Sequence, residues 1–136
     1  MSRKHISFSE LKVWNECAYK HKLSYVDEVK KFIGNEYTAF GKAIHDTCEK
    51  SVLSGSIIDQ NSFFTHRFLK EIQDLFEKGV DMDKKLLKEM KFQAEGMMHH
   101  ILPALKDYFG DYEVISAEEE LYLPIDGIKH KYKGFI

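Results

Sequence analysis

The chain has 136 residues, which suits one hydrophobic core, and its 43% hydrophobic and 13% aromatic content with two prolines excludes a disordered segment. No apolar stretch reaches membrane-spanning length, and residues 1–5 lead into no signal-like segment, so we expect no membrane association. The two cysteines lie too far apart to predict a zinc knuckle or a disulfide framework, which favours a cytoplasmic, intracellular protein.

The formal charge of −2 gives no global nucleic-acid signal, but the charge is unevenly distributed along the chain. An acidic block without Lys or Arg consists of Asp111, Glu113, Glu118, Glu119, Glu120 and Asp126. It is followed at once by Lys129, Lys131 and Lys133, which alternate along a predicted strand and therefore share one face. We expect these lysines to protect a sheet edge, with contact to phosphate groups as the alternative.

The first predicted helix begins at Phe8. Ser7 and Glu10 match a capping box, in which the hydroxyl and the carboxylate satisfy amides at the start of the helix. With this start, Leu11 and Trp14 would face the core.

The next segments are one mixed segment, a loop and two helices. Residues 17–25 interleave basic and aromatic side chains and are predicted as a mixed helix or turn, and residues 27–37 as a loop. A second helix is predicted over residues 38–53, ending near Gly55, and a third over residues 62–78. The side chains that repeat at helical spacing in these two helices are Phe40, Ile44, Thr47 or Cys48, Ser51 or Val52, and then Phe64, Phe68, Ile72, Leu75 and Phe76.

The fourth predicted helix is the longest and covers residues 83–109. Its apolar stripe consists of Leu86, Met90, Ala94, Met97, Ile101, Leu105 and Tyr108. Pro103 lies inside this stripe, and we expect it to kink the helix because proline lacks a backbone donor and clashes with the preceding turn.

The hydrophobic period changes after Gly110. Residues 113–124 and 128–136 are predicted strands, and Asp126-Gly127 between them is a strong signal for a two-residue hairpin turn. The predicted fold class is therefore α/β, with about four helices followed by two strands. These two strands would form the opening hairpin of a sheet, with its turn at Asp126 and Gly127.

We interpret residues 1–136 as a single partial domain, with a helical part over residues 1–110 and an opening β-hairpin over residues 111–136. The second strand ends at Ile136 inside an apolar run, where it would expose pairing groups and apolar surface. We therefore expect the chain to be the front part of a longer protein.

Two residues carry the candidate chemistry. His45 follows Gly41 by one helical turn, and a glycine there permits close approach of another backbone or a ligand. Glu118 lies on a predicted strand and would share a face with Glu120, and an inward carboxylate there would need a cation or a donor. Taken alone, His45 is better explained by a hydrogen-bonded core histidine than by a ligand, and His45-Asp46 also matches the dipeptide of HD-type phosphohydrolases.

The order of five segments changes this assessment. Residues 7–9, 17–25, 40–45, 117–118 and 134–136 together resemble the RecB-like branch of the PD-(D/E)XK nucleases, a resemblance that covers most of the chain. In that branch a Ser-rich helix start precedes a Cys and an aromatic-ended segment, then a Gly-x-x-x-His helix and a Gly-x-Ile-Asp strand. The implied fold is the helical part and first hairpin of a restriction-endonuclease-like sheet.

The resemblance implies roles for individual residues. His45 matches the metal-site histidine, and Glu118 matches a glutamate on the strand before the catalytic aspartate, so both are expected to be catalytic and metal-binding. The aspartate itself would directly follow Ile136, and the Glu-x-Lys strand and the Gln-x-x-x-Tyr helix have no match. Cys17 matches the first cysteine of iron–sulfur members, but the other three have no match, so we expect no cluster.

The expected function is metal-dependent hydrolysis of DNA, by an exonuclease or an endonuclease, with Mg²⁺ or Mn²⁺ as cofactor. The expected DNA contacts are made by Lys20, Lys22, Tyr25 and Lys42. DNA repair or recombination, a helicase or recombination partner and a phage-like origin fit that branch, and residues 1–136 alone are expected to be inactive. The leading alternative is a non-enzymatic nucleic-acid-binding or interaction module, and an HD-type phosphohydrolase is the third.

Overall fold

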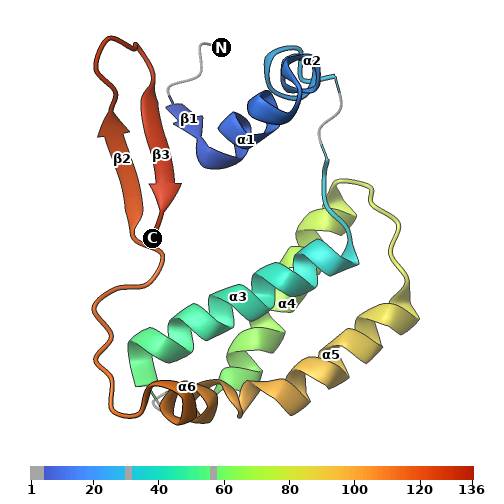
Figure 1. The fold of residues 1–136 in the computed structure, drawn as a ribbon. Coiled ribbons are helices and arrows are strands. Elements are labelled where there is room, and N and C mark those ends of the chain that lie inside the picture. The colour runs from blue at the N-terminus through green and yellow to red at the C-terminus, as the bar shows by residue number, and fades with distance from the viewer. Residues whose placement is uncertain (1–4, 30–31, 56–57) are drawn as a thin grey trace. The chain divides into compact units, whose positions relative to one another are not determined.

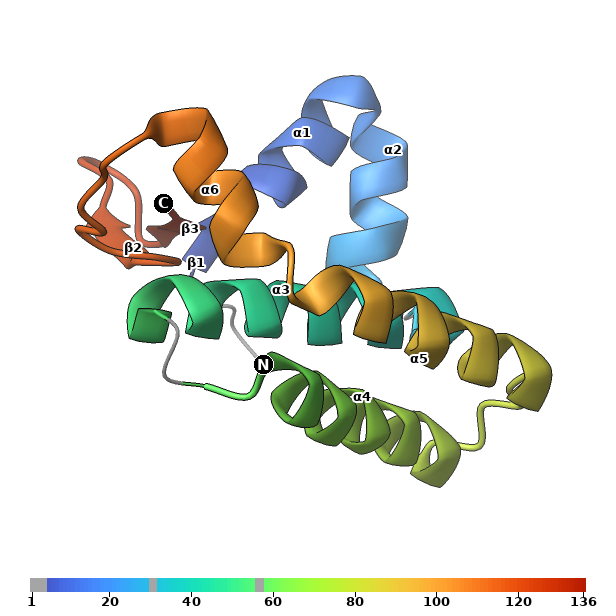
Figure 2. The same cartoon turned by 90° about the horizontal axis from the view of Figure 1, so that it is seen from below.

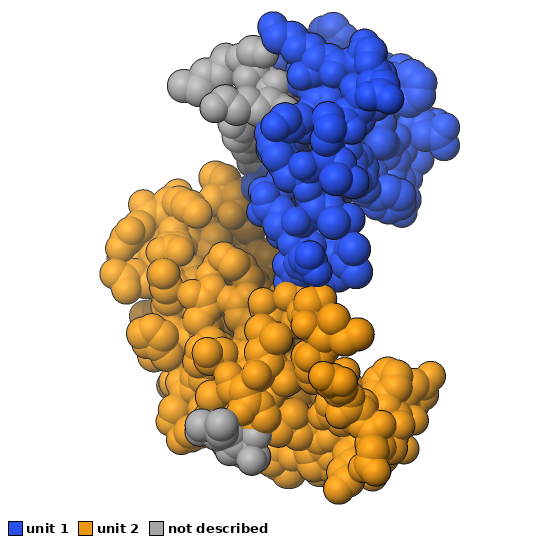
Figure 3. All heavy atoms as spheres, turned by 90° about the vertical axis from the view of Figure 1, so that its left-hand side faces the viewer, with its two compact units in different colours: residues 1–32, 118–136 blue, residues 33–117 orange. Residues whose placement is uncertain are grey.

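The computed structural model describes residues 5–29, 32–55 and 58–136. Within these residues the chain has a mixed α/β, helix-rich fold with six α-helices, one π-helical turn and a three-stranded sheet (Figure 1). The α/β prediction is confirmed, whereas about four helices was too few. The chain divides into two compact units, residues 1–32 with 118–136 (unit 1) and residues 33–117 (unit 2), coloured blue and orange in Figure 3.

Unit 1 combines both ends of the sequence. Strand β1 (His5–Ser7) leads directly into helix α1 (Phe8–Glu16), which is followed by the short helix α2 (Ala18–His21) and the π-helical turn η1 (Lys22–Val26). The other end supplies strands β2 (Glu120–Pro124) and β3 (Lys131–Phe135).

The start of α1 confirms the predicted helix. The Ser7 hydroxyl accepts a hydrogen bond from the Glu10 backbone amide at 3.2 Å. The two apolar side chains expected in the core are instead exposed, Leu11 by 44% and Trp14 by 57%. The reason is a rotation of the helix, because α1 turns buried Glu10 and half-buried Val13 inwards.

The sheet of unit 1 has the order β1-β3-β2 (Figure 1). β1 runs parallel to β3, with His5 opposite Lys131, and β2 runs antiparallel to β3, with Glu120 opposite Phe135. β1 was not predicted from the sequence, and β2 and β3 are shorter than the predicted strands. Lys129 precedes β3, so the shared face of the lysines begins only at Lys131.

The predicted turn forms, but it does not close a two-residue loop. The Ile128 amide donates to the Ile125 carbonyl at 3.1 Å across Asp126 and Gly127. Gly127 has a φ of 75°, whereas Asp126 is not among the described residues with positive φ. A two-residue type I′ loop needs positive φ at both central positions, so the strands pair only from Pro124 and Lys131 outwards.

Unit 2 consists of four helices: α3 (Glu36–Ser54), α4 (Gln60–Glu77), α5 (Lys84–Met98) and α6 (Ile101–Phe109). α3 contacts the other three, and α4 also contacts α5 (Figure 2). Among the described residues, none of the helices is both long and apolar enough to cross a bilayer.

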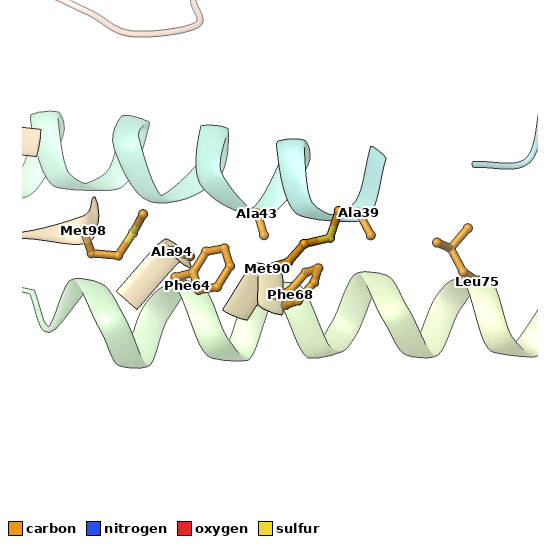
Figure 4. Close-up of a cluster of buried hydrophobic side chains, with 8 residues drawn as sticks. All are labelled: Ala39, Ala43, Phe64, Phe68, Leu75, Met90, Ala94 and Met98. Carbon is orange, nitrogen blue, oxygen red and sulfur yellow. The ribbon is translucent and has the colours of Figure 1, made fainter. Parts of the chain in front are cut away.

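The core of unit 2 lies between α3, α4 and α5. Its buried apolar members are Ala39, Ala43, Phe64, Phe68, Leu75, Met90, Ala94 and Met98 (Figure 4). Small alanines on α3 face the stacked rings of Phe64 and Phe68, whose centroids are 5.4 Å apart. Burial of these side chains is the main favourable term that holds the helices together.

Each of the three predicted apolar stripes was wrong in part. The buried side of α3 is centred on Ala39, Ala43, Thr47 and Ser51, one position away from the predicted Phe40 and Ile44, which are half-buried. Phe76, Met97 and Tyr108 are exposed. The packed side of each helix is therefore narrower than the run of apolar residues in the sequence.

The long fourth helix is two helices rather than one kinked helix. α5 ends at Met98 and α6 begins at Ile101, with the His100 amide donating to the Met97 carbonyl at 3.0 Å. The break lies in the turn before Pro103, where a proline ring clashes with the carbonyl four residues earlier. Pro103 is then in the first turn of α6, where the missing amide costs nothing.

Candidate functional site

His45 lies on α3, a helix with strong end signals. Asn35 and Thr38 cap its start reciprocally, with amide-to-side-chain distances of 3.1 and 2.8 Å. Gly55 ends it with a φ of 61°. These local signals explain why the sequence forms a long helix here, and why its ends lie close to the predicted ones.

The His45 side chain belongs to the outer side of α3. At 100° per residue it lies roughly opposite buried Ala43 and Thr47, and the residue is exposed. The interpretation of His45 as a buried core histidine is therefore wrong. Gly41 lies one turn earlier on the same side, and a Cβ added there would meet no atom within 4 Å.

Next to His45 is a charge network between α3 and α4. The Arg67 Nε donates to Asp46 Oδ2 at 2.7 Å, and the Arg67 Nη2 also contacts this oxygen. Glu71 Oε1 lies 3.5 Å from Arg67 Nη2 and 2.7 Å from Lys42 Nζ. We call Lys42, Asp46, Arg67 and Glu71 the α3–α4 charge network. Lys42, a predicted DNA contact, is thus paired with a carboxylate, although its side chain remains 56% exposed.

Arg67 and Glu71 were not among the residues predicted from the sequence. Their spacing of four residues on α4, matched by Lys42 and Asp46 on α3, is a signal that could have revealed the network. The network also bears on the HD-type alternative. The Asp46 carboxylate is bound by a guanidinium, a cation, in the place where that alternative would require a metal ion.

Glu118 does not lie on a strand. Its φ is 54°, in the left-handed region, and β2 begins two residues later at Glu120. The prediction that Glu118 and Glu120 share a strand face is therefore wrong, because a left-handed residue interrupts the alternation of side chains. The intervening Glu119 exchanges two backbone hydrogen bonds with Ile136, each of 3.1 Å, so Glu118 is next to the end of β3.

The remaining predicted DNA contacts lie on α2 and η1 of unit 1. Lys20 Nζ is 3.4 Å from Glu16 Oε2, and Lys22 Nζ contacts Asp27, but both lysine side chains are 59% exposed. The Tyr25 ring stacks on His21 with centroids 5.4 Å apart. The predicted mixed helix or turn is confirmed.

A buried carboxylate fixes this segment to α1. Glu10 Oε1 and His21 Nε2 are 2.8 Å apart, and both side chains are less than one fifth exposed. The hydrogen bond joins α1 to the end of α2, directly before η1, which carries Lys22 and Tyr25. A π-helical turn such as η1 is often found at functional sites.

The predicted site residues are thus divided between the units: Glu118, Lys20, Lys22 and Tyr25 in unit 1, His45 and Lys42 in unit 2. The approach of His45 to Glu118 stays a prediction. Among the described residues, no group of three or more His, Cys, Asp or Glu side chains is arranged to hold a metal ion. A carboxylate and an imidazole suit Mg²⁺ or Mn²⁺ as ligand types, and the other positions of a six-coordinate ion would be taken by water, substrate phosphate or further side chains.

The two cysteines differ in their surroundings. Cys17 is exposed, and its Sγ accepts a hydrogen bond from the Lys20 amide at 3.5 Å at the start of α2. Cys48 is half-buried on α3, and this burial raises the pKa of its thiol above the ordinary value. Cys48 is therefore the less reactive thiol.

Comparison with known proteins assigns the family. A family model described as the PD-(D/E)XK nuclease superfamily matches residues 5–130, which is most of the chain. The chain belongs to the PD-(D/E)XK nuclease superfamily. This membership implies a nuclease-type enzyme that acts on nucleic acid, and such nucleases generally use divalent metal ions. Neither the curated proteins nor the solved structures that were compared gave a match.

Proposed function

We propose that the protein is a DNA nuclease of the RecB-like branch that depends on Mg²⁺ or Mn²⁺. The observation that carries the proposal is the superfamily match over residues 5–130, which includes both His45 and Glu118. His45 supports it further, because an exposed histidine on the outer side of α3 is accessible to an ion or a substrate.

In the proposed mechanism, His45 contributes a neutral imidazole and Glu118 a carboxylate to the ion. A divalent ion bound there would polarise the phosphodiester and lower the pKa of an attacking water. Lys20, Lys22 and Tyr25 would line the path of the DNA, with the lysines contacting phosphates and giving affinity rather than sequence choice. We further propose that residues after Ile136 complete the ligand set, and that residues 1–136 form a single partial domain, as the Gly-x-Ile-Asp resemblance implies.

The test is cleavage of linear double-stranded and single-stranded DNA by the full-length protein, with Mg²⁺, Mn²⁺ or EDTA. His45→Ala should lower the rate by at least about a hundredfold, because even the partners of metal ligands typically cost 10–100-fold when mutated. His66→Ala removes another exposed histidine of unit 2, on α4, and is the matched control. Equal rates for His45→Ala and His66→Ala would refute the site, and EDTA-resistant cleavage would refute the metal.

A second experiment separates the nuclease from the leading alternative. Residues 1–136 alone should not cleave DNA, because His45 and Glu118 cannot hold an ion in a reactive geometry without further ligands. Robust cleavage by this chain that His45→Ala abolishes would contradict the proposed ligand set. If the full-length protein binds DNA but never cleaves it, the non-enzymatic binding module becomes the better explanation.

A further inference from the structure

One face of the sheet in unit 1 combines aromatic and basic side chains. In the observed register Tyr122 pairs with Lys133, and Phe135 pairs with Glu120. Directly paired residues project to the same side of a sheet, and so does every second residue along one strand. Together with the parallel pair of His5 and Lys131, this defines the basic–aromatic face, which consists of His5, Ser7, Glu120, Tyr122, Pro124, Lys131, Lys133 and Phe135.

The side chains of this face already contact one another. Lys131 Nζ lies 5.0 Å from the centroid of the Tyr122 ring, and Lys133 Nζ lies 5.4 Å from that of Phe135. His5 packs edge-on against Tyr122, with centroids 6.3 Å apart. The two aromatic rings are therefore held beside ammonium groups on a regular backbone.

The rings remain accessible despite these contacts. Tyr122 is 40% exposed and Phe135 is 57% exposed. By the register they are diagonal neighbours across β2 and β3, a separation of about 7–8 Å. Two aromatic rings at this spacing on an open sheet face can stack adjacent unpaired bases, as the aromatic residues of some RNA-binding sheets do.

The charges of the face complement a nucleic acid backbone. Lys131 and Lys133 are basic, and the single carboxylate, Glu120, lies 3.1 Å from Lys133 Nζ and is half exposed. A nucleic acid offers phosphates to the lysines and flat bases to the rings, whereas an acidic peptide would offer only negative charge to the lysines. A duplex conceals its base faces by stacking, so it would not use the rings.

We propose that the basic–aromatic face binds single-stranded nucleic acid, with bases stacked on Tyr122 and Phe135 and phosphates near Lys131 and Lys133. The choice of nucleic acid rests on the proposed function, but none of the residues of the face is assigned to the metal, and binding there needs no ion. Its binding is therefore measurable where cleavage cannot occur. The partner's sequence matters little, because every base has a stacking surface.

The test is fluorescence anisotropy of a labelled oligo-dT titrated with the protein in EDTA, so that loss of cleavage and loss of binding are distinguished. Phe135→Leu keeps an apolar side chain but removes the flat ring, and should weaken binding about tenfold, because a base loses its stacking surface. Phe135→Tyr restores a ring and should bind like the unmodified protein. Backbone amide chemical shifts of β2 and β3 in each variant show whether the sheet is intact.

The contribution of the lysines is measured separately, by the salt dependence of binding. Lys131→Gln should lower the slope of log K against log salt concentration by about 0.7, the change expected for one lost phosphate contact on a single strand. Lys88→Gln removes an exposed lysine of α5 in unit 2 and is the matched control, expected to leave the slope unchanged. Equal affinity of Phe135→Leu and Phe135→Tyr would overturn the proposal, as would full competition by polyglutamate or tighter binding of a duplex.

Discussion

The α3–α4 charge network gives a prediction whose size follows from the exposure of its members. Arg67 and Asp46 are each 23% exposed and Glu71 is 13% exposed, so the network is neither a surface pair nor fully buried. Arg67→Met keeps the length of the side chain but leaves Glu71 with Lys42 and removes the guanidinium that contacts Asp46. Exposed pairs contribute about 0.2–1 kcal/mol, whereas breaking a buried pair costs about 3–5 kcal/mol. At this partial exposure we expect a loss of about 1–2 kcal/mol.

Urea unfolding followed by far-UV circular dichroism measures this loss, because unit 2 contains the long helices. The midpoint should fall while the slope of the free energy of unfolding against urea stays constant. Combined with Asp46→Asn, Arg67→Met should give a coupling energy of about 1 kcal/mol in a double-mutant cycle.

Lys85→Met is the control for this prediction. Lys85 Nζ is 3.8 Å from Glu89 and its side chain is 86% exposed, so its removal should change the free energy of unfolding by less than about 0.5 kcal/mol. A coupling energy between Arg67 and Asp46 below about 0.3 kcal/mol, or equal losses for Arg67→Met and Lys85→Met, would refute the reasoning.

Three further predictions concern stability and reactivity. Phe64→Ala should destabilise unit 2 by about 3–5 kcal/mol in urea unfolding, because Phe64 is fully buried; a loss below about 1 kcal/mol would contradict the assigned core. Hydrogen bonds from Ser62 lower the pKa of Asp59, so the contribution of this carboxylate to stability should be complete at neutral pH and decline as the pH falls through the lowered pKa. A difference in melting temperature between the unmodified protein and Asp59→Ala that grows on acidification would contradict this. Iodoacetamide should modify Cys17 before Cys48 in the folded protein, and equal rates in guanidinium are the control, whereas faster reaction at Cys48 would contradict its burial and raised pKa.

The sequence predicted best the features that are decided locally. The start of α1 depends on Ser7, and the end of α3 depends on Gly55, whose φ of 61° suits a glycine. Gly127 likewise sets the turn after β2. Such residues act on backbone groups a few positions away, so their effect can be predicted without knowledge of the tertiary structure.

Features that depend on distant partners were not predictable in this way. β1 has three residues and acquires its structure from β3, whose Lys131 pairs with His5 across nearly the whole chain. Trp14 is exposed because the side of α1 that packs is determined by tertiary contacts rather than by the apolar pattern. The positive φ of Glu118 was also hidden, since glutamate seldom adopts it.

For the candidate site, the sequence predicted residue types and their order but not their surroundings. His45 is on the expected helix and, contrary to the core interpretation, is exposed. The Glu10–His21 hydrogen bond was missed because the capping box already explained Glu10. A carboxylate can satisfy one local pattern in the sequence and still have its main partner eleven residues away.

The division of unit 1 between both ends of the sequence determines the order in which the protein is completed during synthesis. Unit 2 is continuous from Ile33 to Ala117 and has all its partners once those residues have left the ribosome. β1 is made before β3, and among the described residues β3 is the strand that pairs with it. Until β3 is made, β1 therefore lacks this partner, and an unpaired strand edge is a place where neighbouring nascent chains can associate.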